Sequence, residues 1–306
     1  MGDLQAPDSR FTRLVSATAG DLPAAVVGAL AEPSPGTPAS TDAAGYTWAS
    51  IAWGNASDRP LLLVHGVTSA GNTFWRIGPA LAATGRHVVA VDLPGHGRTG
   101  GWTGRHRFLE TATDLAAFIR AAGLARPDLE VLGHSWGGLV VANLPRAGIQ
   151  PRTIVLLDPP ARTSDEMESM NRDPLEHRYE DLGEAMAIAR AEFPGWVEGD
   201  VLAKAEGLTR FDVAAVRSIL VENGTWDAGL AALADPAAAG ADAWYVRGEF
   251  ATGSLIAEDV VPRLAARVGA DHVVTIRGGS HSPHRMLPEA TLAATLLALG
   301  DATAAA

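Results

Sequence analysis

Cysteine is absent from this 306-residue chain, and lysine occurs once, at Lys204. Without cysteine the chain holds no disulfide, no zinc–thiolate site and no thiol nucleophile. No apolar run approaches the roughly eighteen residues that cross a bilayer as a helix. The first residues lack a basic region followed by an apolar stretch, so we expect no signal peptide and a cytoplasmic protein.

Positive charge is also scarce. The chain has 24 Lys and Arg against 35 Asp and Glu, a net charge of −11, which argues against nucleic acid and anionic membrane as partners. It has no H-E-x-x-H motif and no histidines clustered at ligand spacing, and the GHG of residues 95–97 is too short for a dinucleotide fingerprint. We therefore expect no metal and no cofactor. The expected partner is a small-molecule substrate, and the sequence leaves the oligomeric state open.

Short apolar segments alternate with helical patterns along most of the chain. Fully apolar strands that alternate with helices predict a mostly parallel sheet with helices on both faces, hence an α/β fold. We expect this core over residues 46–160 and 241–306. Its predicted strands are residues 47–53, 61–64, 88–91, 129–132, 153–157, 243–246 and 272–276.

Two other regions have a different composition. Residues 161–240 show only helical patterns and carry three of the five methionines, so we predict a helical cap. The cap would lie over the carboxyl edge of the sheet, because ligands bind there in open α/β sheets. Residues 32–41 are rich in Pro, Ser, Thr and Gly, and we expect residues 1–45 to form an N-terminal appendage or linker.

One pentapeptide carries a specific chemical signal. Residues 133–137 read GHSWG and match G-x-S-x-G, the turn that lifts a serine nucleophile off the edge of a sheet. An apolar strand precedes the motif, and a helical segment that ends at Pro145 follows it. This setting predicts that Ser135 is a nucleophile.

With three further motifs, the chain resembles the α/β-hydrolase fold family over about residues 47–300. These motifs are LVHGV at 63–67, DLPGHGRT at 92–99 and GGSH at 278–281. The resemblance implies a cap-containing serine hydrolase in which His281 is the base for Ser135, with His284 as a weaker alternative. It also implies that the backbone N–H groups of Val67 and Trp136 form the oxyanion hole.

The acid that orients the base departs from the usual family pattern. Most members carry an aspartate three residues after the glycine that ends the strand before the last. That glycine corresponds to Gly248, and the third residue after it is Ala251. Asp158, at the end of the strand after the elbow, and Glu249 are the two candidates, and we favour Asp158.

A serine at the elbow favours an acyl-enzyme, whereas relatives that open epoxides or displace halide use a carboxylate. We therefore expect hydrolysis of a carboxylic ester or lactone of a small to medium apolar substrate. Carbon–carbon bond hydrolase, thioesterase and amidase use the same machinery and remain alternatives. A small-molecule receptor that keeps the triad is the alternative of another class.

Overall fold

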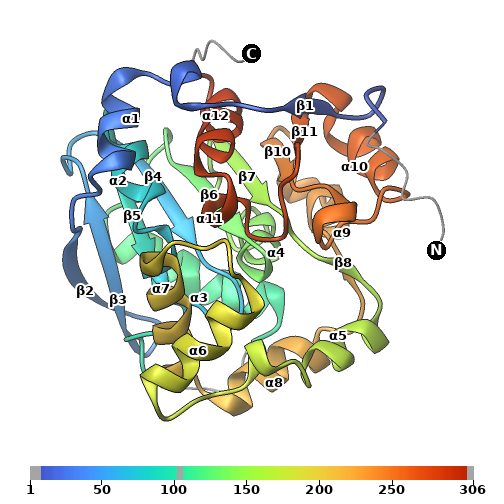
Figure 1. Ribbon diagram of the computed structural model, residues 1–306. Helices are drawn as coiled ribbons and strands as arrows, with labels where there is room; N and C mark the ends of the chain where they lie inside the picture. The colour runs from blue at the N-terminus through green and yellow to red at the C-terminus, as the bar shows by residue number, and fades with distance from the viewer. Residues whose placement is uncertain (1–7, 102–105, 302–306) are drawn as a thin grey trace.

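The computed structural model describes residues 8–101 and 106–301, and a nine-stranded sheet runs through the molecule (Figure 1). Its order is β1-β11-β10-β7-β6-β4-β5-β3-β2. Only the β5–β3 and β3–β2 pairs are antiparallel. The strands are β1 (Arg13–Val15), β2 (Thr37–Ala43), β3 (Tyr46–Trp53), β4 (Arg59–Val64), β5 (Arg86–Val91), β6 (Glu130–His134), β7 (Thr153–Leu157), β10 (Asp242–Arg247) and β11 (Val273–Ile276).

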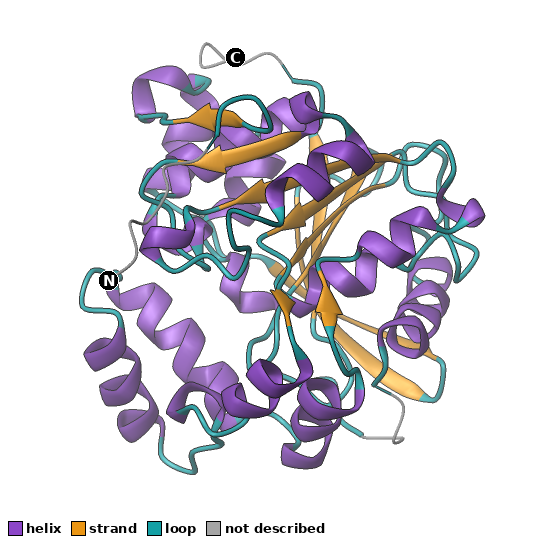
Figure 2. Ribbon diagram, turned by 90° about the vertical axis from the view of Figure 1, so that its right-hand side faces the viewer, coloured by secondary structure: helices purple, strands orange, loops and turns teal. Residues whose placement is uncertain are grey.

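Both faces of the sheet are buried under helices, as Figure 2 shows. In β4, Leu61 and Leu63 join one apolar core while Leu62 and Val64 join the other, as the two-residue period of a strand requires. One core includes residues of α1 (Ala24–Ala31), α2 (Ile77–Ala82) and α12 (Pro288–Ala298). The other includes residues of α3 (Phe108–Ala121), α4 (Trp136–Ala142) and α10 (Val261–Val268). The predicted α/β fold class is therefore confirmed.

The N-terminal region belongs to the sheet, contrary to the appendage that we expected for residues 1–45. The three residues of β1 extend the sheet beyond β11, and β2 pairs along its whole length with β3. Ala44 and Gly45 join β2 to β3 with φ of 52° and 82°, which is the two-residue hairpin turn with both residues at positive φ. The proline-containing β2 is an edge strand, where a missing N–H is tolerated. Residues 1–7 of the predicted appendage and 302–306 of the predicted core lie outside the described residues.

Four helices occupy most of the segment that we predict to be a cap. They are α5 (Ser164–Met170), α6 (Leu182–Glu192), α7 (Glu198–Thr209) and α8 (Val213–Glu222), and they gather at the bottom of the view in Figure 1. Two-residue strands β8 (Ala161–Arg162) and β9 (Trp226–Asp227) pair where the segment leaves and rejoins the core. The last part of the segment, with α9 (Leu230–Ala234), packs on the core, since Gly229 lies against Ala142.

Short elements complete the chain. The remaining α-helix is α11 (Pro283–Met286). The 3₁₀ helices are η1 (Ala19–Asp21), η2 (Gly71–Phe74), η3 (Pro174–Glu176), η4 (Pro236–Ala238), η5 (Phe250–Thr252) and η6 (Ala270–His272). None of the helices within residues 8–101 and 106–301 combines the length and the apolar character needed to cross a membrane.

Candidate active site

Ser135 sits in a strained turn between β6 and α4. Its φ is 54° and its ψ is −125°, a conformation that non-glycine residues rarely adopt. The flanking glycines make the turn possible. A Cβ on Gly133 would lie 2.3 Å from the carbonyl oxygen of Gly137, and a Cβ on Gly137 would lie 2.4 Å from that of Val64. The turn places a nearly buried serine, 8% exposed, at the start of a helix.

His281 lies in hydrogen-bonding contact with Ser135. It follows β11 through a loop in which Gly278 has a φ of 68°. Its Nε2 is 3.0 Å from Oγ of Ser135, which is the geometry of a base that removes the hydroxyl proton. The other ring nitrogen, Nδ1, is 2.7 Å from Oδ2 of Asp158. Three residues that are distant in sequence thus form one hydrogen-bonded chain.

Asp158 is fully buried at the end of β7, and both of its carboxylate oxygens are occupied. Oδ1 accepts hydrogen bonds from the Gly248 N–H at 3.2 Å and from the Ser254 hydroxyl at 2.6 Å. Oδ2 accepts from the Leu255 N–H at 3.0 Å in addition to His281. These contacts fix the carboxylate and satisfy the polar atoms that burial removes from water. The carboxylate in turn fixes the rotation of the His281 ring.

The two alternative residues lie elsewhere. The carboxylate of Glu249 forms no hydrogen bond or ion pair with any of the residues that the structure describes, and the Glu249 N–H donates to Gly279 O at 2.8 Å. His284 is buried, and its Nε2 lies 3.2 Å from the hydroxyl of Thr73. Burial lowers the pKa of His284 well below its usual value. The geometry therefore brings together Ser135, His281 and Asp158, and leaves Glu249 and His284 out.

The two N–H groups that we predict to bind an oxyanion flank the serine. Trp136 is the first residue of α4, where backbone N–H groups lack an acceptor within the helix. Within the described part of the chain, the N–H groups of Val67 and Trp136 have no hydrogen-bond acceptor. Gly66, next to Val67, packs so closely on the serine that a Cβ there would lie 2.8 Å from Ser135 Cβ.

Two buried histidines hold the loops around the site. His65 donates from Nδ1 to Gly66 O at 2.7 Å, while its Nε2 accepts the Leu93 N–H at 3.0 Å. His134 donates from Nε2 to His281 O at 2.8 Å. Burial lowers the pKa of both imidazoles, so both stay neutral and act as fixed hydrogen-bonding groups.

A cavity of about 100 Å³ opens beside Ser135 and His281. Its apolar lining consists of Val67, Met170, Leu175, Phe193 and Trp196. Four of these five come from the segment 161–240, so that segment covers the serine. We expected Phe211 to line the pocket together with Phe193 and Trp196, but it lies away from this cavity, with its ring centroid 6.4 Å from that of His96. The indole of Trp136 is likewise buried against His96, 5.3 Å away.

Three charged residues line the same cavity, and the sequence did not reveal them. Lys204 is 8% exposed and donates to the Thr68 hydroxyl at 2.8 Å, which in turn donates to Glu176 Oε2 at 2.9 Å. Burial lowers the pKa of Lys204 to about 8 and raises that of Glu176. Arg285, 5% exposed, lies on α11 just after His281. The only signal in the sequence was that the single lysine falls in the predicted cap.

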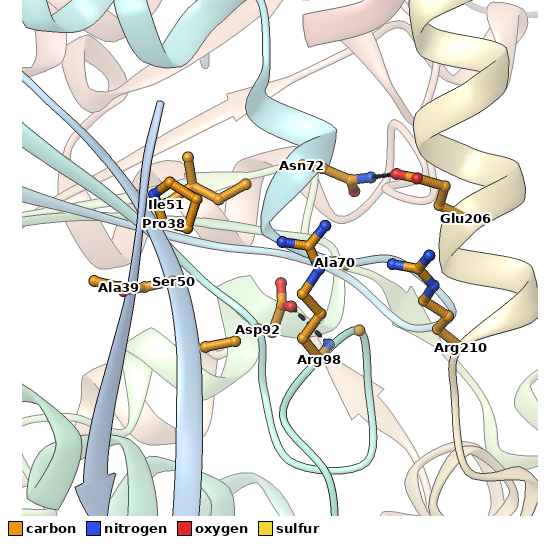
Figure 3. A pocket seen from close by; sticks show the side chains of 12 residues that line it. Pro38, Ala39, Ser50, Ile51, Ala70, Asn72, Asp92, Arg98, Glu206 and Arg210 are labelled. Atoms are coloured by element: carbon orange, nitrogen blue, oxygen red, sulfur yellow. Dashed lines mark hydrogen bonds between the residues drawn. The ribbon is translucent and has the colours of Figure 1, made fainter. Parts of the chain in front are cut away.

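A separate cavity of about 130 Å³ lies between the β2–β3 hairpin and α7 (Figure 3). Arg98 and Arg210 line it, and Asn72 donates a hydrogen bond to Glu206. Its buried carboxylate, Asp92, accepts the N–H groups of Gly71 and Arg98 and so braces the neighbouring loops. Since none of Ser135, His281 and Asp158 lines it, this cavity is not the predicted active site. In the part of the chain that the structure describes, no three His, Asp or Glu side chains gather in a way that would hold a metal.

Comparison with known protein families shows to which family this chain belongs. The model of the alpha/beta hydrolase fold matches residues 59–218, which is 160 of the 306 residues and more than half of the chain. The chain belongs to the α/β-hydrolase fold family. The turn at Ser135, the loop that contains Val67 and four of the sheet strands lie within the matched residues.

Individual relatives share only part of their length with this α/β hydrolase. It is 36% identical over 104 residues to the dihydrolipoyllysine-residue acetyltransferase component of the acetoin cleaving system of Pseudomonas putida, with 34% of this chain and 27% of that protein covered. It is 32% identical over 113 residues to phospholipase YtpA of Bacillus subtilis, covering 35% and 44%. The structure of E-2-(acetamidomethylene)succinate hydrolase superposes with a TM-score of 0.70 at 20% identity, covering 87% and 99%. At this identity the superposition establishes the fold alone.

Proposed function

We propose that this α/β hydrolase is a serine hydrolase that cleaves a carboxylic ester or lactone through an acyl-enzyme. The proposal rests chiefly on the hydrogen-bonded chain Ser135–His281–Asp158, with distances of 3.0 and 2.7 Å. A serine hydroxyl is a weak nucleophile, and a positioned imidazole activates it by removing its proton. The partial match to a phospholipase supports ester chemistry.

We propose a reaction in two halves. Ser135 Oγ attacks the carbonyl carbon as its proton passes to Nε2 of His281. The carbonyl oxygen becomes negative and is stabilised by the N–H groups of Val67 and Trp136. His281 then returns the proton to the leaving alkoxide, which leaves an ester on Ser135.

Water completes the cycle. His281 takes a proton from water, the hydroxide attacks the acyl-enzyme, and the proton is returned to Ser135 as the acid product leaves. Asp158 accepts the hydrogen bond from Nδ1 throughout and thereby keeps Nε2 free to accept the serine proton. The small cavity fits a small substrate.

Residues 161–240 act in this proposal as a cap that selects the substrate and contributes nothing to the triad. Support comes from their share of the cavity lining, which includes Met170, Leu175, Phe193 and Trp196. Because Glu176, Lys204 and Arg285 also line the cavity, we no longer expect a wholly apolar substrate. We now expect an apolar part that contacts the cap together with a polar group.

A fluorophosphonate probe tests the nucleophile directly. We expect one adduct, located by mass spectrometry on Ser135 and absent from folded Ser135→Ala. An adduct on another serine would show that the nucleophile is misassigned. A panel of p-nitrophenyl esters, lactones, thioesters and amides then separates ester hydrolase from thioesterase and amidase. Labelling without multiple turnovers on any substrate would favour the receptor.

A further inference from the structure

Arg285 is a buried cation that lacks an ion pair. Its side chain is 5% exposed and lines the cavity that contains Ser135 and His281. The guanidinium lies over the ring of Trp196, 4.4 Å from its centroid. No carboxylate of the described residues lies within ion-pairing distance of it. A buried charge without a counter-ion costs several kcal/mol, so such groups are normally paired.

Asp200 is the acid whose charge acts on this guanidinium: it raises the pKa of Arg285, which burial lowers to about 10, but the two side chains form no ion pair. Oδ1 accepts the Trp75 Nε1–H at 2.9 Å, and Oδ2 pairs with Arg76 at 3.5 Å. Arg285 reaches only the backbone carbonyl of Asp200, from Nη1 at 3.5 Å. Asp200 therefore offsets the charge of Arg285 only at a distance, and no carboxylate of the described residues bonds directly to this guanidinium.

Hydrogen-bond counting separates Arg285 from the other cation of the cavity. The three donors of Lys204 go to Thr68 Oγ1, Thr68 O and Leu175 O, and its charge faces Glu176 across the Thr68 hydroxyl. Arg285 has five N–H groups, of which three are used: Nε and Nη2 donate to Thr73 Oγ1, and Nη1 donates to Asp200 O. One N–H remains on each terminal nitrogen.

Two N–H groups on the terminal nitrogens of one guanidinium suit the two oxygens of a carboxylate. We propose that the substrate carries a carboxylate, which Arg285 binds in the cavity next to His281. This assignment rests on the proposed ester hydrolysis at Ser135 and adds the chemical class of the substrate. The net charge of −11 would otherwise repel an anion, so a local cation that binds it has to be built into the site.

Paired substrates that differ only in charge test this proposal. Monomethyl glutarate and methyl valerate carry a carboxylate or a methyl group at the same position on the acyl side. Acetoxyacetate and ethyl acetate do the same on the alcohol side. Methanol or acetate release gives kcat/KM for the wild-type chain. We expect the anionic ester of at least one pair to react at least tenfold faster than its neutral partner. Equal rates within both pairs would overturn the proposal.

Two variants assign the effect to one residue. Arg285→Gln should reduce the anionic-to-neutral ratio of kcat/KM by about 10- to 100-fold, the range for hydrogen bonds to charged groups. Arg98→Gln is the matched control, because Arg98 is exposed and lines the separate cavity (Figure 3). It should keep the wild-type ratio. A ratio that persists in folded Arg285→Gln would contradict the assignment.

A binding measurement separates this proposal from the hydrolytic one and does not require Arg285 to be changed. Glutarate should slow fluorophosphonate labelling of wild-type Ser135, whereas glutaramide and inorganic phosphate at the same concentration should not. Stronger protection by phosphate would overturn the carboxylate assignment. Calorimetry on Ser135→Ala then measures the binding of monomethyl glutarate and of methyl valerate, and we expect only the anionic ester to bind. Binding of the anionic ester alone, without turnover by the wild type, would support the carboxylate site and contradict the ester hydrolase.

Discussion

Nδ1 of His281 lies 2.7 Å from Oδ2 of Asp158, although β10 separates the strands that these two residues follow. Asp158 ends β7 and His281 follows β11. The turn after β10 takes part in the arrangement, since the Gly248 N–H donates to the other oxygen of Asp158. A Cβ on Gly248 would lie 2.2 Å from Gly279 O, so the turn is packed tightly beneath the histidine loop.

Replacing the carboxylate of Asp158 should abolish most activity. Asp158→Asn keeps the size of the side chain but favours the wrong tautomer of His281, which in serine proteases costs about 10⁴ in kcat. The matched control is Glu249→Gln, which we expect to lose less than threefold, about the effect of a distant surface charge. Steady-state kinetics on the best ester of the panel measure both.

Thermal melting must accompany this pair, because Asp158 is fully buried and its amide variant changes four hydrogen bonds. A crippled Glu249→Gln with an active Asp158→Asn would place the orienting acid after β10. Loss of activity in both variants with unchanged melting would indicate that the two carboxylates act together.

Trp196 should set the size of the acyl chain without affecting the nucleophile. Its ring stacks on Phe193 with 4.0 Å between centroids, and both residues line the cavity. Trp196→Ala should shift the preference among p-nitrophenyl esters toward longer chains by about tenfold, since each methylene is worth about 1–3 kcal/mol in an apolar pocket. Leu202→Ala, on the exposed side of α7, is the control with no expected shift. Fluorophosphonate labelling of Ser135 should persist in both. Its loss in every soluble cap variant would mean that the cap builds the catalytic centre.

Two Gly→Ala substitutions, one in the turn at Ser135 and one in α1, should have opposite effects on stability. In Gly137→Ala, the added methyl would lie 2.4 and 2.5 Å from the backbone carbonyls of Val64 and His65, so we expect a loss of at least about 3 kcal/mol in the free energy of unfolding. Gly28 lies within α1 with nothing within 4 Å of the position that an added methyl would occupy, and Gly28→Ala should stabilise by about 0.5–1 kcal/mol. Urea denaturation, monitored by circular dichroism, measures the free energy of unfolding of both variants. Equal stability of the two variants would contradict the packing at the elbow.

Lys204 should make stability depend on pH in the alkaline range. Burial lowers its pKa to about 8 in the folded protein from 10.5 in the unfolded chain. Between these values the unfolded chain holds a proton that the folded protein has lost, so stability should rise with pH. The difference in unfolding free energy between the wild type and Lys204→Met should therefore increase in favour of the wild type from pH 8 to 10. A difference in unfolding free energy that stays constant across this range would show that folding does not lower the pKa of Lys204.

Local patterns were sufficient for most of the fold and for the turn that holds Ser135. The apolar strands of the core and the four helices α5–α8 have periods that short windows of sequence display, and Ser135 has a turn motif with its own sterics. Two strands of the nine-stranded sheet, β1 and β2, were missed because they depend on partners, as were the two-residue strands β8 and β9. Residues 37–43 are exposed and contain Pro38, so they resemble a linker until β3 pairs with them.

The charged lining of the cavity was not predictable for a related reason. Lys204, Glu176 and Arg285 come from three separate elements, and burial alone distinguishes them from surface residues. A charge pattern along the chain shows neither burial nor a missing counter-ion. The choice between Asp158 and Glu249 likewise depended on the path of the chain beyond Gly248, which no local pattern specifies.

The pairing of β1 with β11 also has a consequence for how the chain folds. The Thr12 hydroxyl donates to Val273 O at 3.0 Å, across 261 residues of sequence. During synthesis the first strand must therefore wait until the last one has emerged, and long-range pairing of this kind slows folding because the loop must close first. The loop that carries His281 follows this late strand directly. Ser135, His281 and Asp158 would thus come together only after the C-terminal part of the chain has been made, and nascent chains would have no activated serine to acylate.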